Sequence, residues 1–160
     1  MSKFSPRSNY NPTSASFRAD TPSAPARRAR VLFVCIGNAV RSQMAEGFAR
    51  KYGDDLIDAS SAGLAPLGSV PPLTTKVLAA RGVDIPTQFS KGLEAVMGPF
   101  DVVVNISGLK LPPPFDRGER RWEVGDPYGL SEEAYREAAT EIETKVMALI
   151  LELRNARRAR

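Results

Sequence analysis

Residues 31–42 are VLFVCIGNAVRS: an apolar run, a short turn that contains a glycine, and the start of an amphipathic segment. Four consecutive apolar residues at 31–34 are typical of a strand buried inside a parallel sheet. After the turn, apolar side chains recur at a helical period, which predicts a helix over 42–52 that stops at Gly53. A strand that enters a helix through a tight turn predicts an α/β fold and an anion site at that turn.

The rest of the sequence continues this alternation of strands and helices. Further strands are expected at 56–61, 100–106 and 120–124, and further helices at 72–81, at 91–97 and from Ser131 onward. Ser131 is a favourable cap for the last helix, whose apolar side chains form one stripe. The pattern predicts a small doubly wound α/β domain with a parallel sheet of about four strands flanked by helices.

The two ends of the chain differ in composition from its middle. Residues 1–27 are rich in Ser, Pro and Arg and have no apolar period, so we expect a disordered basic tail there. Residues 28–154 are expected to form the folded domain, and 155–160 a frayed basic end. The net charge of +4 resides in these ends, because residues 31–153 hold 12 Lys plus Arg against 17 Asp plus Glu. A basic face for nucleic acid is therefore not expected.

Residue counts exclude several classes of protein. No apolar run approaches the roughly 20 residues that a membrane span needs, so we expect no membrane insertion. A single cysteine excludes an intrachain disulfide, and the absence of histidine excludes His-dependent triads and most zinc sites. A lone free thiol favours a reducing, cytoplasmic setting.

The turn itself carries the residues of an oxyanion site. Backbone N–H groups and the helix N-terminus attract an anion and would stabilise a thiolate at Cys35. Arg41 offers a planar fork of donors that matches two oxygens of phosphate or arsenate. Gly37 and Asn38 tolerate the positive φ that such a turn requires. Ser42 places a hydroxyl near the sulfur, or acts only as a helix cap. The amides that would bind phosphate are those of Ile36, Gly37, Asn38, Ala39, Val40 and Arg41.

A thiolate nucleophile also needs a proton donor for an alkoxide or phenoxide leaving group. Because the chain has no histidine, a carboxylic acid on a loop is the natural donor. Asp126 is the best candidate, since Gly125, Pro127 and Gly129 make its surroundings a turn. The sequence therefore predicts a site with Cys35 as nucleophile and Asp126 as acid, with no metal and no organic cofactor.

Residues 34–42 resemble the signature loop of the low-molecular-weight protein tyrosine phosphatases, Cys-x5-Arg-Ser after the first strand. That family has an Asp-Pro acid loop near the C-terminus, and here Asp126 follows Cys35 by 91 residues. In the larger tyrosine phosphatase families the acid precedes the cysteine. Ser61-Ala62-Gly63 is similar to the family's second-strand exit. The resemblance covers residues 31–153 and implies phosphate-ester hydrolysis through a phosphocysteine.

Other stretches are closer to the arsenate reductases that share this fold. Residues 42–47, Ser-Gln-Met-Ala-Glu-Gly, are one such stretch. Residues 101–107 lie where those reductases have a strand bearing resolving cysteines, and they contain none. The single cysteine excludes an internal, thioredoxin-coupled disulfide relay. A reductase that borrows an external thiol, such as glutathione or mycothiol, needs only Cys35.

The expected substrate walls also differ from those of the phosphatases, which surround a phenyl ring with aromatic side chains. One such aromatic lies in the loop after Ser-Ala-Gly and others follow Asp-Pro. In this chain the loop after Ser61-Ala62-Gly63 has Leu64 and Leu67, and only Tyr128 follows Pro127. We assign Leu67 and Tyr128 as substrate walls. The leading hypothesis is a cysteine-dependent phosphatase acting on protein phosphotyrosine or a small aryl phosphate. An external-thiol arsenate reductase and a non-catalytic module that binds an oxyanion or a phosphoprotein remain as alternatives.

Overall fold

The structure is a computed structural model that describes residues 26–160. The predicted disordered tail at 1–27 therefore lies outside the described residues, except for its last two positions. The described elements are β1 (Ala29–Cys35), α1 (Arg41–Gly53), β2 (Ile57–Gly63), α2 (Pro72–Ala79), the 3₁₀ turn η1 (Leu93–Ala95), β3 (Val102–Asn105), β4 (Glu119–Arg121) and α3 (Glu132–Arg158). None of the helices within residues 26–160 combines the length and the apolar character of a membrane span.

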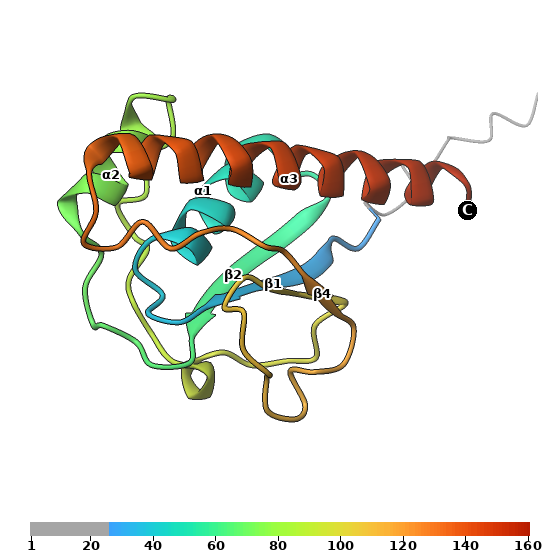
Figure 1. Ribbon diagram of the computed structural model, residues 1–160. Coiled ribbons are helices and arrows are strands. Elements are labelled where there is room, and N and C mark those ends of the chain that lie inside the picture. Colours follow the sequence, from blue (N-terminus) through green and yellow to red (C-terminus); the bar gives the residue numbers. More distant parts are fainter. Residues whose placement is uncertain (1–25) are drawn as a thin grey trace, which may run out of the picture.

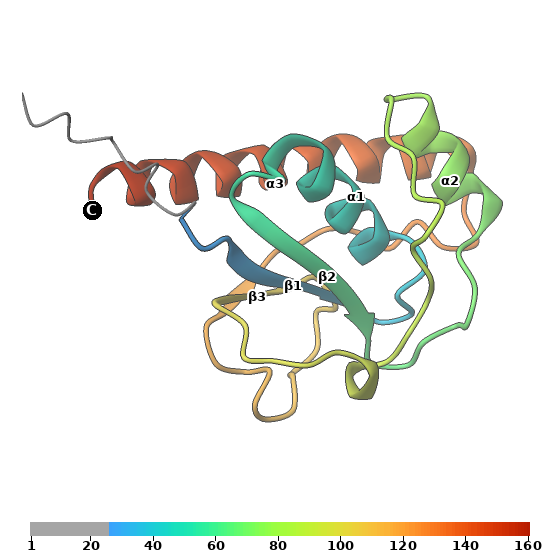
Figure 2. The same cartoon turned by 180° about the vertical axis from the view of Figure 1, so that it is seen from behind.

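The four strands form one parallel sheet in the order β2-β1-β3-β4, which confirms the predicted α/β fold. Strand β1 lies between two neighbours, and its residues Val31–Val34 have no exposed surface. Burying each of these side chains contributes roughly 1.5–3 kcal/mol, which is why this apolar run forms the centre of the sheet. Helices α1, α2 and α3 lie together on one side of the sheet (Figures 1 and 2).

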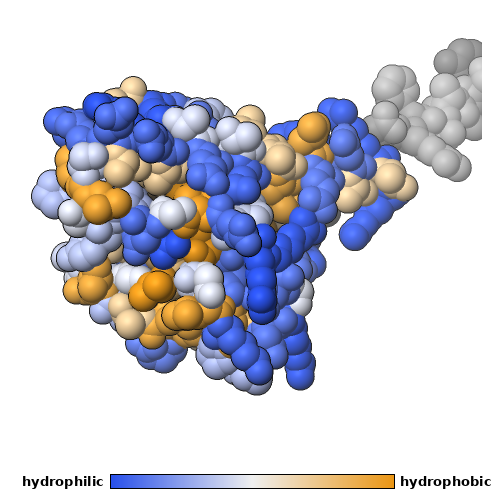
Figure 3. Space-filling view, in the orientation of Figure 1, coloured by the Kyte–Doolittle hydropathy of each residue, from blue (hydrophilic) through white to orange (hydrophobic). Residues whose placement is uncertain are grey.

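The larger apolar core lies between the sheet and these helices. Helix α3 contributes the predicted stripe, with Tyr135, Ala138, Ile142, Val146 and Leu149 buried. The opposite face of the sheet has a smaller cluster around Leu32, Val34 and Val103, and irregular segments cover it. In the view of Figure 3 the described residues present several small apolar patches separated by hydrophilic side chains.

The helix that we predicted over 91–97 was wrong: only the short turn Leu93–Ala95 forms there. The backbone of Lys91 is used by distant partners, because its N–H donates to Asn38 Oδ1 and its carbonyl accepts from Gly63. Val96 then adopts an extended conformation with φ −112°. The carbonyl of Lys91 is therefore not free to accept the hydrogen bond from residue 95 that the first turn of the predicted helix requires.

Predicted element boundaries also moved by a few residues, as the last strand and the last helix illustrate. The last strand occupies Glu119–Arg121, and α3 runs through Arg158 instead of fraying after residue 154. Arg154 pairs with Asp55 at 2.8 Å, and Arg157 donates to the carbonyl of the same aspartate. Basic residues in a last helical turn also complement the helix dipole, so the helix continues.

Candidate active site

The carboxyl ends of three neighbouring strands meet at one edge of the sheet, on the left in Figure 1. In the parallel register, Cys35 is paired with Gly63 of β2, and Val34 is paired with Asn105 of β3. Residues 35–41, called here the anion loop, connect this end of β1 to α1. In open α/β sheets ligands bind at this edge, so the fold brings the predicted loop to the expected place.

The path of the anion loop depends on two special backbone positions. Asn38 has φ +45°, in the left-handed region predicted for this turn. At Gly63 an added Cβ would lie 2.7 Å from both the backbone nitrogen of Asn38 and the carbonyl oxygen of Ile36. Only a glycine at the end of β2 lets the loop lie so close. This close approach explains why the Ser-Ala-Gly motif ends in a glycine at position 63.

Cys35 lies at the base of the loop with 3% of its surface exposed. Its Sγ is 2.9 Å from Ser42 Oγ, so a hydroxyl lies beside the sulfur as the sequence suggested. Helix α1 begins at Arg41, and no side chain caps it, so Ser42 is a residue of the first turn and not the cap. The contact places Ser42 where its O–H can donate to a thiolate.

Asn38 is the centre of a buried polar network beneath the loop. Its Nδ2 donates to Ser42 Oγ at 2.8 Å and to Ser61 Oγ at 2.9 Å. Its Oδ1 accepts from Gln43 Nε2 at 3.0 Å and from the N–H of Lys91 at 2.9 Å. Both ends of the amide are thus used by the protein, which fixes the orientation of Asn38 and, through Ser42, the surroundings of the Cys35 sulfur.

The guanidinium of Arg41 is buried, with 5% of the residue exposed. One terminal nitrogen donates to the carbonyls of Ile106 at 2.8 Å and Val124 at 2.9 Å. The other lies 3.5 Å from Asp126 Oδ2. Arg41 is therefore hydrogen-bonded to two separate segments of the chain. These bonds fix the orientation of the guanidinium, whose remaining N–H groups can donate to two oxygens of an anion.

Asp126 lies at the rim of the same site, with 44% of its side chain exposed. Its Oδ1 accepts from the N–H of Tyr128 at 3.1 Å, so the turn holds the carboxylate toward Arg41. A pocket of about 210 Å³ joins the predicted groups: its lining comprises Cys35, Ile36, Gly37, Ala39, Val40, Arg41, Ala65, Leu67, Asp126 and Tyr128. Asn38 and Ser42 do not line this pocket, and their side chains belong to the network beneath it.

Sequence reasoning missed several residues that support the loop. Thr74 of α2 donates its hydroxyl to the carbonyl of Ala39 at 3.0 Å, and Ser90 donates to that of Gly37 at 3.0 Å. Gln43 also donates to the carbonyl of Phe89. Their sequence surroundings gave no signal, because the contacts join segments about 35 to 53 residues apart.

Glu46 is a buried carboxyl group close to this network. It has 2% exposed surface, and burial raises its pKa above the usual value of 4.5. Arg50 at 3.3 Å, Lys91 and a hydrogen bond with Ser61 oppose this effect on the pKa of Glu46. Burial also lowers the pKa of Lys91. The protonated form of Glu46 is thus favoured relative to an exposed glutamate.

Comparison with known proteins agrees with this geometry. The profile of the low molecular weight phosphotyrosine protein phosphatase family matches residues 30–112. A protein of Synechocystis sp. named glutaredoxin arsenate reductase is 35% identical over 78% of this chain and 98% of its own length. The chain therefore belongs to the low molecular weight phosphotyrosine protein phosphatase family, which is catalytic and uses a cysteine.

Solved structures of both activities within this family are similar to the chain. A structure described as an arsenate reductase in the phosphate binding state has a TM-score of 0.72 and 33% identity, covering 78% of this chain and 98% of that one. A low molecular weight protein tyrosine phosphatase from T. tengcongensis has a TM-score of 0.67 and 30% identity, with 78% and 99% covered. Similarity alone thus does not distinguish a phosphatase from an arsenate reductase.

Proposed function

We propose that the protein hydrolyses phosphomonoesters through a covalent phosphocysteine at Cys35. The observation that carries this proposal is that the chain's only cysteine shares one small pocket with Arg41 and Asp126. Ester hydrolysis by this route needs one thiol, one cation and one acid, and the pocket supplies all three. No second thiol is required.

In the first step the Cys35 sulfur attacks phosphorus in line with the leaving oxygen. The anion-loop amides and Arg41 hold the equatorial oxygens, and Asp126 gives its proton to the leaving oxygen as the P–O bond breaks. In the second step Asp126, now a carboxylate, accepts a proton from the attacking water. The P–S bond breaks with its electron pair on sulfur, and Ser42 at 2.9 Å donates a hydrogen bond to the thiolate that leaves.

The pocket walls support an aryl phosphate or a protein phosphotyrosine as the substrate class. Leu67 and Tyr128 both line the pocket, and both are about half exposed, at 49% and 54%. One aliphatic and one aromatic side chain at the mouth offer apolar contact to a ring without any further charge. This assignment extends the proposed function from the reacting phosphate to its leaving group.

Arsenate reduction with an external thiol is a second candidate. The 35% identical relative named glutaredoxin arsenate reductase supports it, as does the stretch Ser-Gln-Met-Ala-Glu-Gly at 42–47. Cys35 would displace water from arsenic. The external thiol sulfur would then bond to the Cys35 sulfur while the As–S electron pair stays on arsenic and arsenite leaves. A second thiol would release Cys35 and carry away the disulfide.

One preparation tests both candidates. We would measure turnover of p-nitrophenyl phosphate and of a phosphotyrosine peptide beside arsenate reduction with glutathione, with mycothiol and with glutaredoxin plus glutathione. Hydrolysis that phosphate inhibits and that is lost in Cys35→Ser supports the phosphatase. Thiol-dependent arsenite release without ester hydrolysis would assign the reductase instead. Phosphate binding without either reaction would leave only an oxyanion-binding module.

A further inference from the structure

Residues 88–91, called here the clasp, join three parts of the site that are far apart in sequence. Gln88 donates to the backbone carbonyl and the side-chain oxygen of Gln43 in α1. Lys91 donates its N–H to Asn38 in the anion loop. Its carbonyl accepts from Gly63, where residues 63–68, the wall loop, begin. The clasp has no regular secondary structure, so these hydrogen bonds define its position.

Within the clasp, the Ser90 hydroxyl connects the anion loop directly to the wall loop. It donates to the carbonyl of Gly37 at 3.0 Å. It also accepts from the N–H of Gly68 at 3.0 Å. The Ser90 hydroxyl therefore donates its proton to the anion loop, which lines the pocket, and accepts a hydrogen bond from the wall loop, which carries Leu67.

The wall residue Leu67 lies immediately before the point that Ser90 holds. An added Cβ on Gly37 would meet Leu67 Cγ at 2.9 Å, so the leucine side chain lies directly over this glycine. Gly68 has φ +84°, in the left-handed region that favours glycine. The residue Leu67 is 49% exposed, so few side chains pack on it. Its backbone is held on one side by its own N–H, which donates to the carbonyl of Gly37 at 3.0 Å, and on the other by the hydrogen bond from Gly68 to Ser90.

We propose that Ser90 is a specificity-determining residue, which fixes Leu67 at the mouth of the pocket and thereby selects for ligands that carry an apolar ring next to the oxyanion. This proposal deepens the proposed function, on which it rests for its substrate class. Ser90 does not line the pocket, so it acts through Leu67 as a positioning residue.

The anion loop keeps other supports when this hydroxyl is removed. The carbonyl of Gly37 also accepts from the N–H of Leu67 at 3.0 Å, so it keeps a partner when Ser90 is shortened. The donors available to an anion are backbone N–H groups and Arg41, and Arg41 is anchored on Ile106 and Val124. Loss of the Ser90 hydroxyl should therefore change ring binding and leave inorganic phosphate binding unchanged.

The test is a double-mutant cycle on ligand affinity, measured by calorimetry with inorganic phosphate and with benzylphosphonate, which cannot be hydrolysed. The variants are Ser90→Ala, Leu67→Ala and the double variant. Thr74→Val is the matched control, because it removes a hydroxyl that supports the anion loop at Ala39 without touching the wall loop.

We expect Ser90→Ala to weaken benzylphosphonate binding about threefold to tenfold and to change phosphate binding less than twofold. The two alanine variants should be non-additive, since Ser90 acts through Leu67, whereas Thr74→Val and Leu67→Ala should add. Additive effects of Ser90→Ala and Leu67→Ala, or equal losses for both ligands, would overturn the proposal.

These binding measurements separate this inference from the proposed function. Non-additivity in a protein that hydrolyses no ester would preserve the role of Ser90 and sink the phosphatase. Hydrolysis of aryl phosphates by a protein that shows additive effects would do the reverse. A wild-type protein that binds phosphate but not benzylphosphonate would overturn the role of Ser90 and leave oxyanion chemistry standing.

Discussion

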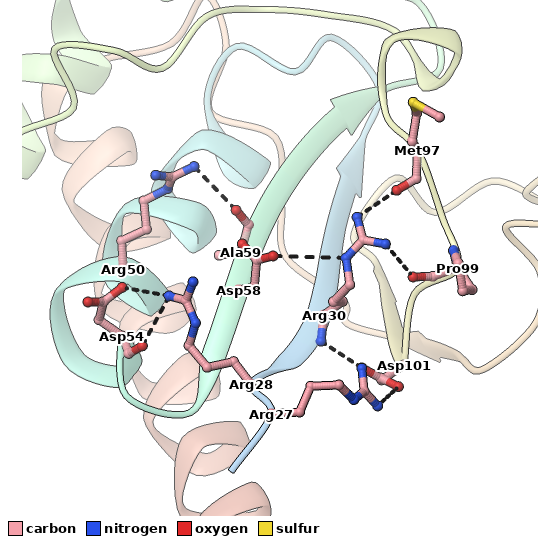
Figure 4. A network of polar contacts seen from close by, with 10 residues as sticks. All are labelled: Arg27, Arg28, Arg30, Arg50, Asp54, Asp58, Ala59, Met97, Pro99 and Asp101. Atoms are coloured by element: carbon pink, nitrogen blue, oxygen red, sulfur yellow. Dashed lines mark hydrogen bonds and ion pairs between the residues drawn. The ribbon is translucent and has the colours of Figure 1, made fainter. Parts of the chain in front are cut away.

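The two ends of the parallel sheet treat polar side chains in opposite ways. At the carboxyl end, Asn38, Arg41 and Ser42 are at most 5% exposed and each makes hydrogen bonds within the protein. At the amino end the polar groups are arginines and aspartates on the surface, such as Arg27 with Asp101 (Figure 4). Arg27 is bidentate on Asp101, yet its side chain is 72% exposed.

The difference in burial determines what each network contributes. Among the described residues no buried side-chain nitrogen or oxygen lacks a partner, so the network at the carboxyl end is complete and rigid. Leaving one of its groups without a partner costs about 1–3 kcal/mol. Exposed ion pairs contribute roughly 0–1 kcal/mol because water competes with them. The chain thus has precise geometry at one end and mostly solvated charge at the other.

The largest effect is expected for Cys35→Ser, because no other thiol exists in the chain. Turnover should fall to a trace, whereas binding of phosphate or vanadate should persist, since the loop amides and Arg41 remain. Steady-state kinetics measure the turnover of this variant, and calorimetry measures its phosphate binding. More than trace turnover in this variant would show that Cys35 is not the nucleophile.

Asp126→Asn should lower p-nitrophenyl phosphate turnover by about 10²- to 10⁴-fold, since it removes the general acid. The loss should grow as the leaving group becomes more basic, because a poorer leaving group depends more on protonation. A series of aryl phosphates with rising leaving-group pKa measures this trend. A deficit of constant size across the series would remove Asp126 from the role of proton donor.

Arg41→Lys should lower turnover by about 10²- to 10³-fold and weaken phosphate binding, because an ammonium cannot reproduce the bidentate fork. Arg27→Lys is the matched substitution at the amino end of the sheet, where the arginine is also bidentate. It should leave kinetics unchanged. Similar kinetics for both variants would break the contrast between the two ends.

Glu46→Gln tests the buried carboxyl by the pH dependence of unfolding. Because folding raises the pKa of Glu46, the folded state binds its proton more tightly than the unfolded state does. The stability contributed by this proton is present at and below about pH 4.5 and is lost as the pH rises through the folded value. The free energy of unfolding of the wild type, measured in urea, should therefore fall relative to that of Glu46→Gln as the pH rises. The exposed Glu141→Gln is the control, and an equal trend for both would contradict this reading.

The smallest effect is expected for Asp101→Asn at the amino end. Arg27 and the N–H of Arg30 donate to this carboxylate and lower the pKa of Asp101, so it stabilises the fold above its usual pKa and less as the pH falls. With an exposed pair the loss at neutral pH should be at most about 1 kcal/mol, and it should vanish on acidification. Turnover should not change. Denaturant unfolding at two pH values measures this loss of unfolding free energy. A loss several times larger than about 1 kcal/mol would mean that the network at the amino end is as tightly packed as the one at the active site.

Local sequence patterns predicted the parts of the site that depend on neighbouring residues. The apolar run at 31–34 and the residues from Cys35 to Arg41 were enough to predict a strand, a turn and the start of a helix. Asp126 was predicted from the glycines and the proline of its own turn. The helix expected at 91–97 failed because Lys91 uses its backbone for Asn38 and Gly63. The clasp was missed for the same reason: its partners are distant in sequence, and no local pattern records them.

The single thiol, Cys35, also determines what happens when the protein is oxidised. A sulfenic acid formed on Cys35 by peroxide has no second cysteine among the 160 residues to capture it as an intramolecular disulfide. Rescue then depends on a thiol from solution, which must enter through the same 210 Å³ pocket as the substrate. Without such a thiol, continued exposure to peroxide drives the sulfur to the irreversible sulfinic and sulfonic acids.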